Sequence, residues 1–261
     1  MNDAGAARSR IAIVTGGCRG IGRGIALRLA RDGATVVAWD LEDVVAQHRD
    51  VEQLAGPGIR GSVQVAAVDL VSQEQIEQGV QRVVSEHGTV DILVNNAAIS
   101  PKTDGARVPP HETSLQEWEQ VMRVNLTGPF LACRAVIPHM QRGGWGRIVN
   151  MSSKAGRSGA MLAGLGYGVS KTGVNGLTRT LAPHVAPMGI TINSIAPGRI
   201  RTPMAAGVSD EVNARLVAAT PVGRAGEPED IAALVAYLCS DEAGFITGDT
   251  VDINGGAYMA P

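Results

Sequence analysis

Residues 11–22 read IAIVTGGCRGIG, and this stretch decides the fold. The run from Ile11 to Thr15 has the β-branched composition of a strand buried on both faces. The glycines that follow are spaced G-x-x-x-G-x-G, at Gly16, Gly20 and Gly22. A strand that turns tightly into a helix needs glycine where φ is positive and where another group must come close. The helix then begins with free N–H groups, so the stretch predicts a β–loop–α unit that binds the phosphates of a nucleotide.

The rest of the chain alternates short β-branched runs with longer amphipathic stretches. Strands are predicted at 35–39, 63–68, 90–94, 147–151, 190–195 and 250–253. Helices are predicted from Ile21 to before Gly33, at 43–54, 72–87, from Ser114 past Asn125, and at 167–182 and 228–238. Strands that alternate with helices form a parallel sheet covered on both faces. We therefore predict a Rossmann-type, doubly wound α/β fold with seven parallel strands, and a single domain over residues 1–261.

Composition and charge exclude several classes of protein. The net charge is −2 with no basic block, which argues against binding of nucleic acid. No apolar run approaches the ~20 residues of a membrane span, and the polar amino terminus lacks the pattern of a secretory leader. Cys18, Cys133 and Cys239 are odd in number and far apart, which favours reduced thiols over disulfides or a metal site. We expect a cytoplasmic protein without a metal ion.

Motifs further along the chain resemble those of the short-chain dehydrogenase/reductase family, from Ile11 to Gly256. Each motif alone is weak, but their order is highly specific. The matching pieces are TGGCRGIG at 15–22, VDL at 68–70, NNAA at 95–98, VNLTG at 124–128, IVNMSS at 148–153, YGVSK at 167–171, PGRIRT at 197–202, FITG at 245–248 and NGG at 254–256. The chain is similar to the single-domain branch, which includes 3-oxoacyl-carrier-protein reductases and many secondary-alcohol dehydrogenases. The resemblance implies hydride transfer between a nicotinamide cofactor and a secondary alcohol or ketone.

The same resemblance implies the catalytic residues. Tyr167 and Lys171 are four positions apart and so share one face of a helix. Tyr167 is then the proton donor and acceptor, and Ser153 hydrogen-bonds the substrate oxygen. Ser153 is chosen over Ser152 because it directly precedes the segment Lys154–Gly156, as the family's serine precedes its glycine. A free tyrosine has a pKa near 10, and the Lys171 ammonium and an oxidised nicotinamide would both lower it.

Asn125 is the fourth catalytic candidate. By resemblance it holds a water that links Lys171 to bulk solvent. The alternative is a buried asparagine that satisfies backbone groups, and the two interpretations are compatible.

Cofactor contacts are expected from the glycine loop, from the end of the second strand and from the later motifs. They are Gly16, Arg19, Gly20, Ile21, Gly22, Asp40, Asp69, Leu70, Asn96, Ala97, Tyr167, Lys171, Pro197, Gly198, Ile200 and Thr202. Asp40 lies 18 positions past Gly22, where a carboxylate accepts hydrogen bonds from the adenosine ribose hydroxyls. It would repel the 2′-phosphate of NADP, so we predict NAD. Arg19 is either a phosphate contact or a solvated loop residue.

The expected partners are a small-molecule substrate and further copies of this chain. Small residues along the helix from Tyr167 permit close packing, and the resemblance suggests a homotetramer. Pro183 should kink that helix or end it near Ala182, because proline lacks the N–H and clashes with the preceding turn. Two alternatives are a cofactor-binding sensor without catalysis and an epimerase or dehydratase on the same fold. The three residues Ser153, Tyr167 and Lys171 argue against the first, and the length of the chain argues against the second.

Overall fold

A seven-stranded parallel sheet forms the centre of the computed structural model, which describes residues 9–54, 59–102, 107–159, 163–202 and 210–260. The strand order is β3-β2-β1-β4-β5-β6-β7. The strands are β1 Ile11–Thr15, β2 Thr35–Asp40, β3 Ser62–Ala67, β4 Ile92–Asn95, β5 Gly146–Met151, β6 Ile190–Pro197 and β7 Thr250–Ile253. The chain steps outward from β1 on one side and from β4 on the other, which places the reversal between these two strands. The predicted doubly wound fold is confirmed.

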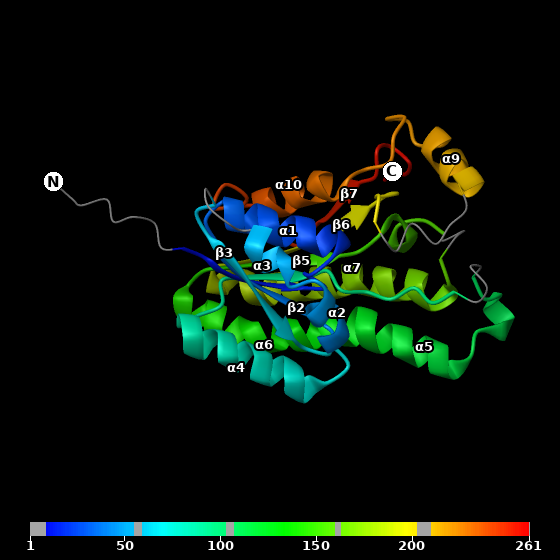
Figure 1. Ribbon diagram of the computed structural model, residues 1–261. Helices are drawn as coiled ribbons and strands as arrows, with labels where there is room; N and C mark the ends of the chain where they lie inside the picture. The colour runs from blue at the N-terminus through cyan, green and yellow to red at the C-terminus, as the bar shows by residue number, and fades with distance from the viewer. Residues whose placement is uncertain (1–8, 55–58, 103–106, 160–162, 203–209, 261) are drawn as a thin grey trace.

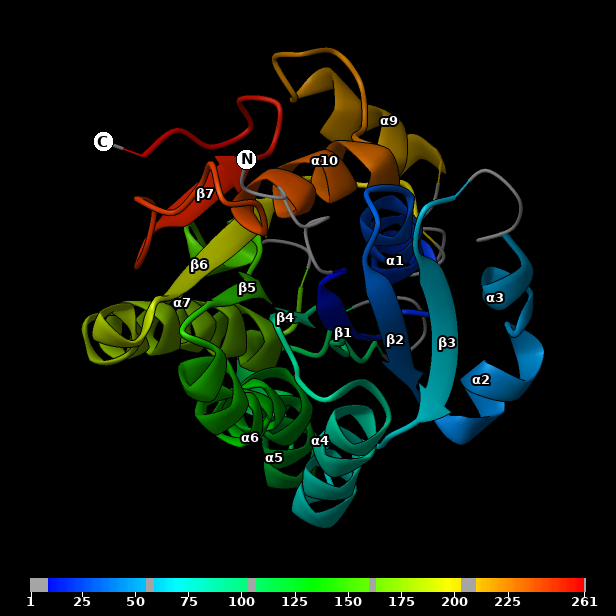
Figure 2. The ribbon, with the colours of Figure 1, turned by 90° about the vertical axis from the view of Figure 1, so that its left-hand side faces the viewer.

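Helices cover both faces of the sheet (Figures 1 and 2). One face carries α1 Gly20–Arg31 and α10 Pro228–Leu238, and the other carries α4 Gln73–His87, α6 Gly128–Gly143 and α7 Leu165–Val185. The shorter helices are α2 Glu42–Gln47, α3 Asp50–Leu54, α5 Leu115–Met122 and α9 Asp210–Ala218. Single turns are η1 Pro110–Glu112, η3 Lys154–Gly156, η4 Ala186–Met188 and the π-helical η2 Arg123–Thr127. None of the helices in the described ranges is long and apolar enough to cross a membrane.

The alternation of side chains along the strands builds two cores. In β1, Ala12 and Val14 pack in the cluster beneath α1 and α10, whereas Ile11 and Ile13 pack in the cluster beneath α4, α6 and α7. All five residues of this strand are buried, as expected for a parallel sheet that is covered on both sides. The fold therefore fixes the carboxyl ends of the strands at one edge, where ligands bind in proteins of this architecture.

Two predictions of a single continuous helix were wrong, because each stretch is divided in the structure. The stretch 43–54 is divided into α2 and α3. The long helix expected from Ser114 is divided by the π-helical turn η2 into α5 and α6. Pro129 supplies a physical reason, because it has no N–H to donate to the carbonyl of Asn125 four residues earlier.

Of the two outcomes expected at Pro183, a kink or an early end of α7 near Ala182, the early end was wrong. The helix continues through Pro183 to Val185. Proline at this position removes one hydrogen bond in the last turn only, and Ala182 and Val185 on either side are buried in the core. Packing of these two residues holds the last turn despite the missing donor.

The three cysteines are free and buried. Burial raises the pKa of each thiol to about 12, so the neutral form is the stable one. These thiols are consistent with the predicted reduced state.

Candidate active site

The loop between β1 and α1 requires glycine at three positions, because a side chain there would cause backbone strain or a clash. Gly16 and Gly20 have φ of 62° and 54°, in the left-handed region. At Gly22, a Cβ would lie 2.0 Å from the Gly16 carbonyl oxygen. The loop therefore leaves a backbone-lined cradle at the amino terminus of α1, beside half-buried Ile21. Such a cradle fits a pyrophosphate, since the helix N–H groups point into it.

Asn96 holds the cradle in place. Its amide nitrogen donates to the carbonyl oxygens of Thr15 at 3.0 Å and Gly16 at 3.1 Å. The Thr15 hydroxyl in turn accepts from the backbone N–H groups of Asn96 and Ala97, at 3.0 and 3.1 Å. This positioning role was missed by sequence reasoning, which assigned Asn96 and Ala97 only to the ribose. The contacts join β1 to β4, and so depend on the tertiary fold.

Asp40 ends β2 directly beside this loop. Its carboxylate accepts the Cys18 N–H at 3.3 Å and the Leu41 N–H at 3.1 Å, and the side chain is half-buried. Arg19 is exposed. The neighbouring Arg23 is engaged with Asp50 at 2.6 Å. A half-buried carboxylate therefore dominates the charge at the point where an adenosine ribose would lie.

The remaining predicted cofactor residues lie at the carboxyl ends of β3 and β6. The Asp69 carboxylate accepts the Val71 N–H at 3.1 Å, and Leu70 is buried. At β6, the Gly198 N–H donates to the Ile253 carbonyl at 3.0 Å. Pro197 and Ile200 are buried, and half-buried Thr202 lies at the end of a described range. The parallel sheet thus brings all predicted cofactor residues to one edge.

Tyr167 and Ser153 meet at this same edge. Burial raises the pKa of the Tyr167 phenol, and a hydrogen bond with the Ser153 side chain opposes the rise. The Ser153 hydroxyl also accepts the Ala155 N–H at 3.1 Å. Ser152 is used elsewhere, since its hydroxyl donates to the Lys171 carbonyl at 3.0 Å. The geometry therefore favours Ser153 over Ser152 as the residue that faces a substrate.

Lys171 is buried one turn further along α7. Its ammonium group donates to the Met151 carbonyl at 2.7 Å and lies 5.7 Å from the centroid of the Tyr167 ring. Burial lowers the pKa of Lys171 to about 8. The lowering of the Tyr167 pKa by Lys171 together with an oxidised nicotinamide stays a prediction, because it requires the bound cofactor. Burial is the largest influence on the phenol, and the ammonium group is directed at a backbone carbonyl.

Asn125 lies in the π-helical turn and is fully buried. Its side-chain oxygen accepts the Ile99 N–H at 2.8 Å, and its amide nitrogen donates to the Ile99 carbonyl at 2.9 Å and the Ser170 hydroxyl at 3.2 Å. The side chain therefore does satisfy backbone groups, as the alternative interpretation had it. The π-helical turn was missed, although Pro129 was a signal for it.

A cradle for pyrophosphate at the switch point of a doubly wound sheet, with a buried lysine and a serine-bonded tyrosine beside it, defines a dinucleotide-dependent enzyme. Comparison with known proteins gives the family. Residues 16–258 match the family model adh_short_C2, described as enoyl-(acyl carrier protein) reductase. The chain belongs to the short-chain dehydrogenase/reductase family, as its motifs predicted. It is an oxidoreductase that transfers a hydride to or from a nicotinamide cofactor at a CH–OH or keto group.

Three similar proteins cover nearly the whole chain. Acetoacetyl-CoA reductase of Rhizobium meliloti is 42% identical over 253 residues, which are 97% of this chain and 100% of the relative. A 3-oxoacyl-[acyl-carrier protein] reductase from Brucella melitensis with bound NAD has a TM-score of 0.88 at 38% identity, covering 97% of this chain and 93% of that one. A putative gluconate 5-dehydrogenase from Beutenbergia cavernae with NADP at low occupancy has a TM-score of 0.87 at 35% identity, covering 97% and 98%.

Proposed function

We propose that this chain is an NAD-preferring 3-oxoacyl thioester reductase, which also oxidises the matching 3-hydroxyacyl thioester. The contact that carries the catalytic part of the proposal is the Tyr167–Ser153 hydrogen bond, one helical turn from buried Lys171. The substrate class is supported by the similar proteins named above, two of which reduce 3-oxoacyl thioesters by their names.

In the reduction, the Tyr167 phenol gives its proton to the substrate oxygen while a hydride reaches the carbonyl carbon. The Ser153 hydroxyl stabilises the charge that develops on that oxygen. The bound cofactor supplies the hydride, and in its oxidised form it adds a positive charge beside the phenol. That charge would offset the effect of burial, which raises the pKa of Tyr167. The Lys171 ammonium group would add a second positive charge near the phenol. The Met151 carbonyl holds this ammonium group in place.

Asn125 would help to return the proton from solvent. Its carbonyl receives no α-helical hydrogen bond from Pro129. We propose that this backbone region holds the water predicted near Lys171, while the Asn125 side chain fixes the turn to Ile99.

The preference for NAD is supported by Asp40. The carboxylate would accept bonds from the ribose hydroxyls and repel a 2′-phosphate. The similar structures hold NAD in one case and NADP in another. They therefore support a nicotinamide cofactor, and the choice between the two rests on this residue and exposed Arg19.

We also propose a homotetramer in the cytoplasm, with each chain one domain. Exposed apolar side chains lie on α5, α6 and α7, and others lie near the carboxyl terminus. They are Leu115, Phe130, Leu165 and Val169, and Phe245 and Met259. Burial of such patches between copies is a common reason for apolar exposure. Sedimentation at micromolar concentration tests the assembly, and a monomer would overturn it.

The test of the reaction is a spectrophotometric assay with NADH. We expect acetoacetyl-CoA to be reduced with a higher kcat/KM than a sugar acid, a cyclic ketone or a 2-oxo acid. The same assay with NADPH measures cofactor choice independently. Turnover of another ketone with no turnover of the thioester would reject the substrate class, and no reduction of any ketone with either cofactor would reject the proposed reductase activity.

A further inference from the structure

Four buried polar side chains form a continuous line of hydrogen bonds across the core. They are Asn95 at the end of β4, Asn150 in β5, Thr178 in α7 and Ser194 in β6, and their exposures are 3%, 0%, 0% and 0%. The Asn95 amide nitrogen donates to the Asn150 side-chain oxygen at 2.8 Å. The Asn150 amide nitrogen donates to the Thr178 hydroxyl at 2.9 Å, and that hydroxyl is 2.7 Å from the Ser194 hydroxyl. We call these four residues the polar line.

The strand register explains the position of the line. Asn95 is the partner of Asn150 in the β4–β5 pair, and Asn150 is the partner of Ser194 in the β5–β6 pair. Register partners project to the same face of a sheet, here the face that α7 covers. Thr178 approaches from α7 and completes the line between Asn150 in β5 and Ser194 in β6.

Stability alone is a poor explanation for these residues. A buried polar group contributes little net free energy even when it is hydrogen-bonded, and an apolar residue of similar shape is often as stable. The Asn95 side-chain oxygen is buried and has no partner among the described residues. The line therefore contains an unsatisfied group that a hydrophobic core would avoid, which calls for another explanation.

Three residues of the polar line, Asn95, Asn150 and Thr178, lead to the site. Asn95 precedes Asn96, whose amide holds the glycine cradle. Asn150 precedes Met151, whose carbonyl oxygen accepts the Lys171 ammonium group at 2.7 Å. Thr178 lies seven residues after Lys171 on α7, which is two turns along the same face. The line therefore bonds the helix that carries the lysine to the strand that holds it.

We propose that Thr178 is a positioning residue for the reaction. Its hydroxyl accepts from the Asn150 amide and shares a hydrogen bond with the Ser194 hydroxyl, and these two contacts set how far α7 lies along β5. That position brings Lys171 to the Met151 carbonyl and Tyr167 to Ser153. Displacement of a reacting group by about 1 Å can lower a rate about 100-fold, so a single well-placed hydroxyl has a measurable effect. This inference rests on the proposed roles of Tyr167 and Lys171.

Two substitutions at this position separate positioning from packing. Thr178→Val keeps the shape and removes the hydroxyl, whereas Thr178→Ser keeps the hydroxyl and removes a methyl group. If the hydroxyl positions α7, Thr178→Val lowers kcat at least ~10-fold with the KM for NADH within about twofold, and Thr178→Ser stays within about threefold of the unmodified enzyme. A role in packing alone predicts the reverse order, because the serine variant leaves a cavity.

The control is Thr180→Val, an exposed threonine on the same helix, which should leave kcat unchanged. Ser194→Ala removes the other partner of the hydroxyl and serves if Thr178→Val fails to fold; a loss of kcat in the same direction is expected. Unchanged kcat in either variant, with Tyr167→Phe inactive, would overturn the positioning role alone. An active Tyr167→Phe would overturn the proposed function, and this inference with it.

Discussion

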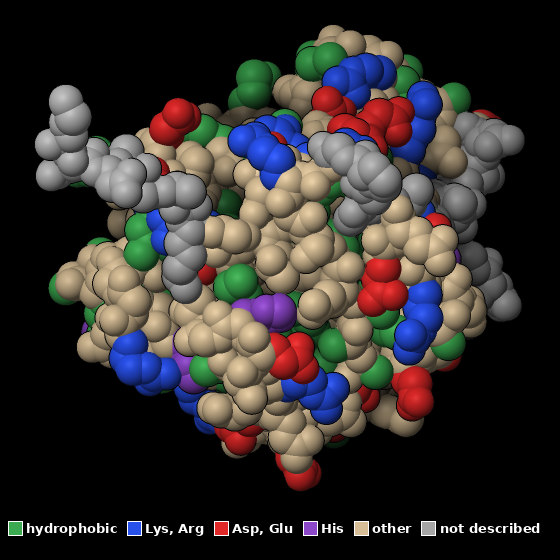
Figure 3. Space-filling view, turned by 60° about the vertical axis from the view of Figure 1, so that its left-hand side comes forward, with side chains coloured by type: hydrophobic (Ala, Val, Ile, Leu, Met, Phe, Trp, Pro, Cys, Tyr) green, Lys and Arg blue, Asp and Glu red, His purple; other side chains and the backbone are tan. Residues whose placement is uncertain are grey.

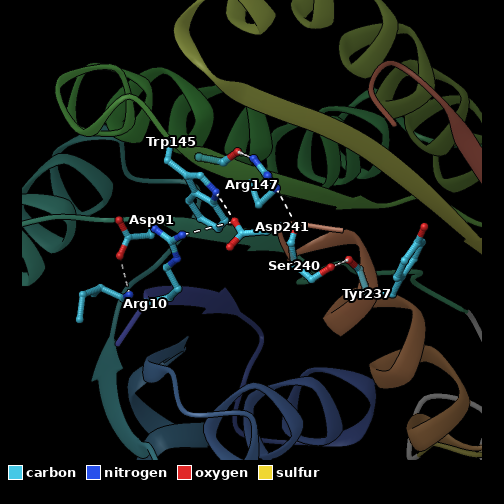
Figure 4. A network of polar contacts seen from close by, with 9 residues as sticks. Arg10, Asp91, Trp145, Arg147, Tyr237, Ser240 and Asp241 are labelled. Atoms are coloured by element: carbon cyan, nitrogen blue, oxygen red, sulfur yellow. Dashed lines mark hydrogen bonds and ion pairs between the residues drawn. The ribbon is translucent and has the colours of Figure 1, made fainter. Parts of the chain in front are cut away.

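The two ends of the sheet differ in the groups that surround their positively charged side chains. At the amino end, Asp241 accepts the Trp145 indole N–H at 2.7 Å and Arg10 at 3.4 Å. Arg10 and Arg147 both stack on the Trp145 ring, at 3.7 and 4.3 Å from its centroid (Figure 4). At the carboxyl end, the ammonium of Lys171 is buried against a neutral carbonyl. At the amino end, Asp241 and the Trp145 ring offset part of the cost of burial, which also lowers the pKa of Arg147. At the carboxyl end, a neutral carbonyl receives Lys171, and burial lowers the pKa of this lysine to about 8.

The surface at the amino end carries charges of both signs. On the face in Figure 3, which brings the amino end of the sheet forward, basic and acidic side chains are interspersed. Such a surface suits solubility and exposed ion pairs, which contribute little to stability individually. A destabilised buried charge is a mark of functional sites. We infer that the buried Lys171 cation lowers the stability of the fold and is kept for its role in the reaction.

The strongest test of this division is removal of the phenol. Tyr167→Phe keeps the ring and removes the transferable proton, so kcat should fall by ~10²–10⁴-fold while NADH still binds. Steady-state kinetics and cofactor titration measure the two effects. Tyr237→Phe, an exposed tyrosine on α10, is the control and should retain full activity. Near-normal turnover of the Tyr167 variant would remove this residue from the mechanism.

The second test uses pH. With a pKa of about 8, Lys171 is protonated below that pH and neutral above it. The phenol stays protonated over the same range because its pKa is raised. The kcat for ketone reduction should therefore be level below about pH 8 and fall by up to ~10-fold per unit above it.

Lys171→Arg keeps the charge to higher pH and supplies the comparison. Its rate should be lower overall but should no longer fall between about pH 8 and 9.5. An identical fall in both enzymes would assign the titration to another group.

The third test concerns cofactor choice at the carboxyl end. Like charges ~4 Å apart repel by about 1 kcal/mol in water and about 4 kcal/mol at an effective dielectric of 20. We expect NAD to be preferred by at least ~10-fold in kcat/KM, and Asp40→Ala to narrow this gap mainly by improving the use of NADP. Asp43→Ala, an exposed carboxylate in the next helix, should not change the ratio. Equal or better use of NADP by the unmodified enzyme would show that Arg19 outweighs Asp40.

The smallest effect is expected at the amino end. Asp241 is 77% exposed, so Asp241→Asn should lower the free energy of unfolding by only ~0.2–1 kcal/mol and leave kcat unchanged. Asp32→Asn breaks the exposed pair with Arg28 on α1 and is the matched control. The Asp241 change should cost more, because this carboxylate serves two donors. A loss of kcat in the Asp241 variant would contradict the division between the two ends.

The sequence predicted most of what depends on local pattern. The bounds of β1 and β7 agree with the structure at both ends, because both are short β-branched runs followed directly by a glycine or asparagine turn. The predicted helix starts at Ser72 and Ser114 are capped by these serines, with Ser72 accepting the Gln75 N–H at 3.2 Å and Ser114 the Glu117 N–H at 3.1 Å. The family motifs placed the site residues at one edge of the sheet, but their roles stay predictions.

What could not be predicted depends on contacts between distant segments. The Met151 carbonyl that receives Lys171, and the amide of Asn96 that holds the cradle, are set by the sheet and have no local signal. The continuation of α7 through Pro183 shows the same limit. A rule on proline gave the wrong end of the helix, because buried neighbours in the final turn outweigh one missing hydrogen bond.

The three buried thiols provide reporters of local opening in three parts of the molecule. Only a thiolate reacts with a disulfide reagent, and burial suppresses both access and ionisation here. Cys18 lies in the glycine loop, Cys133 contacts Asn95 of the polar line at 3.4 Å, and Cys239 ends α10 near the amino-end network. The rate at which each thiol is labelled therefore measures how often its own part of the chain opens. A cofactor in the cradle should slow the labelling of Cys18 and leave the rate of Cys239 unchanged. The ratio of the two rates would then compare the local opening of the two ends of the sheet.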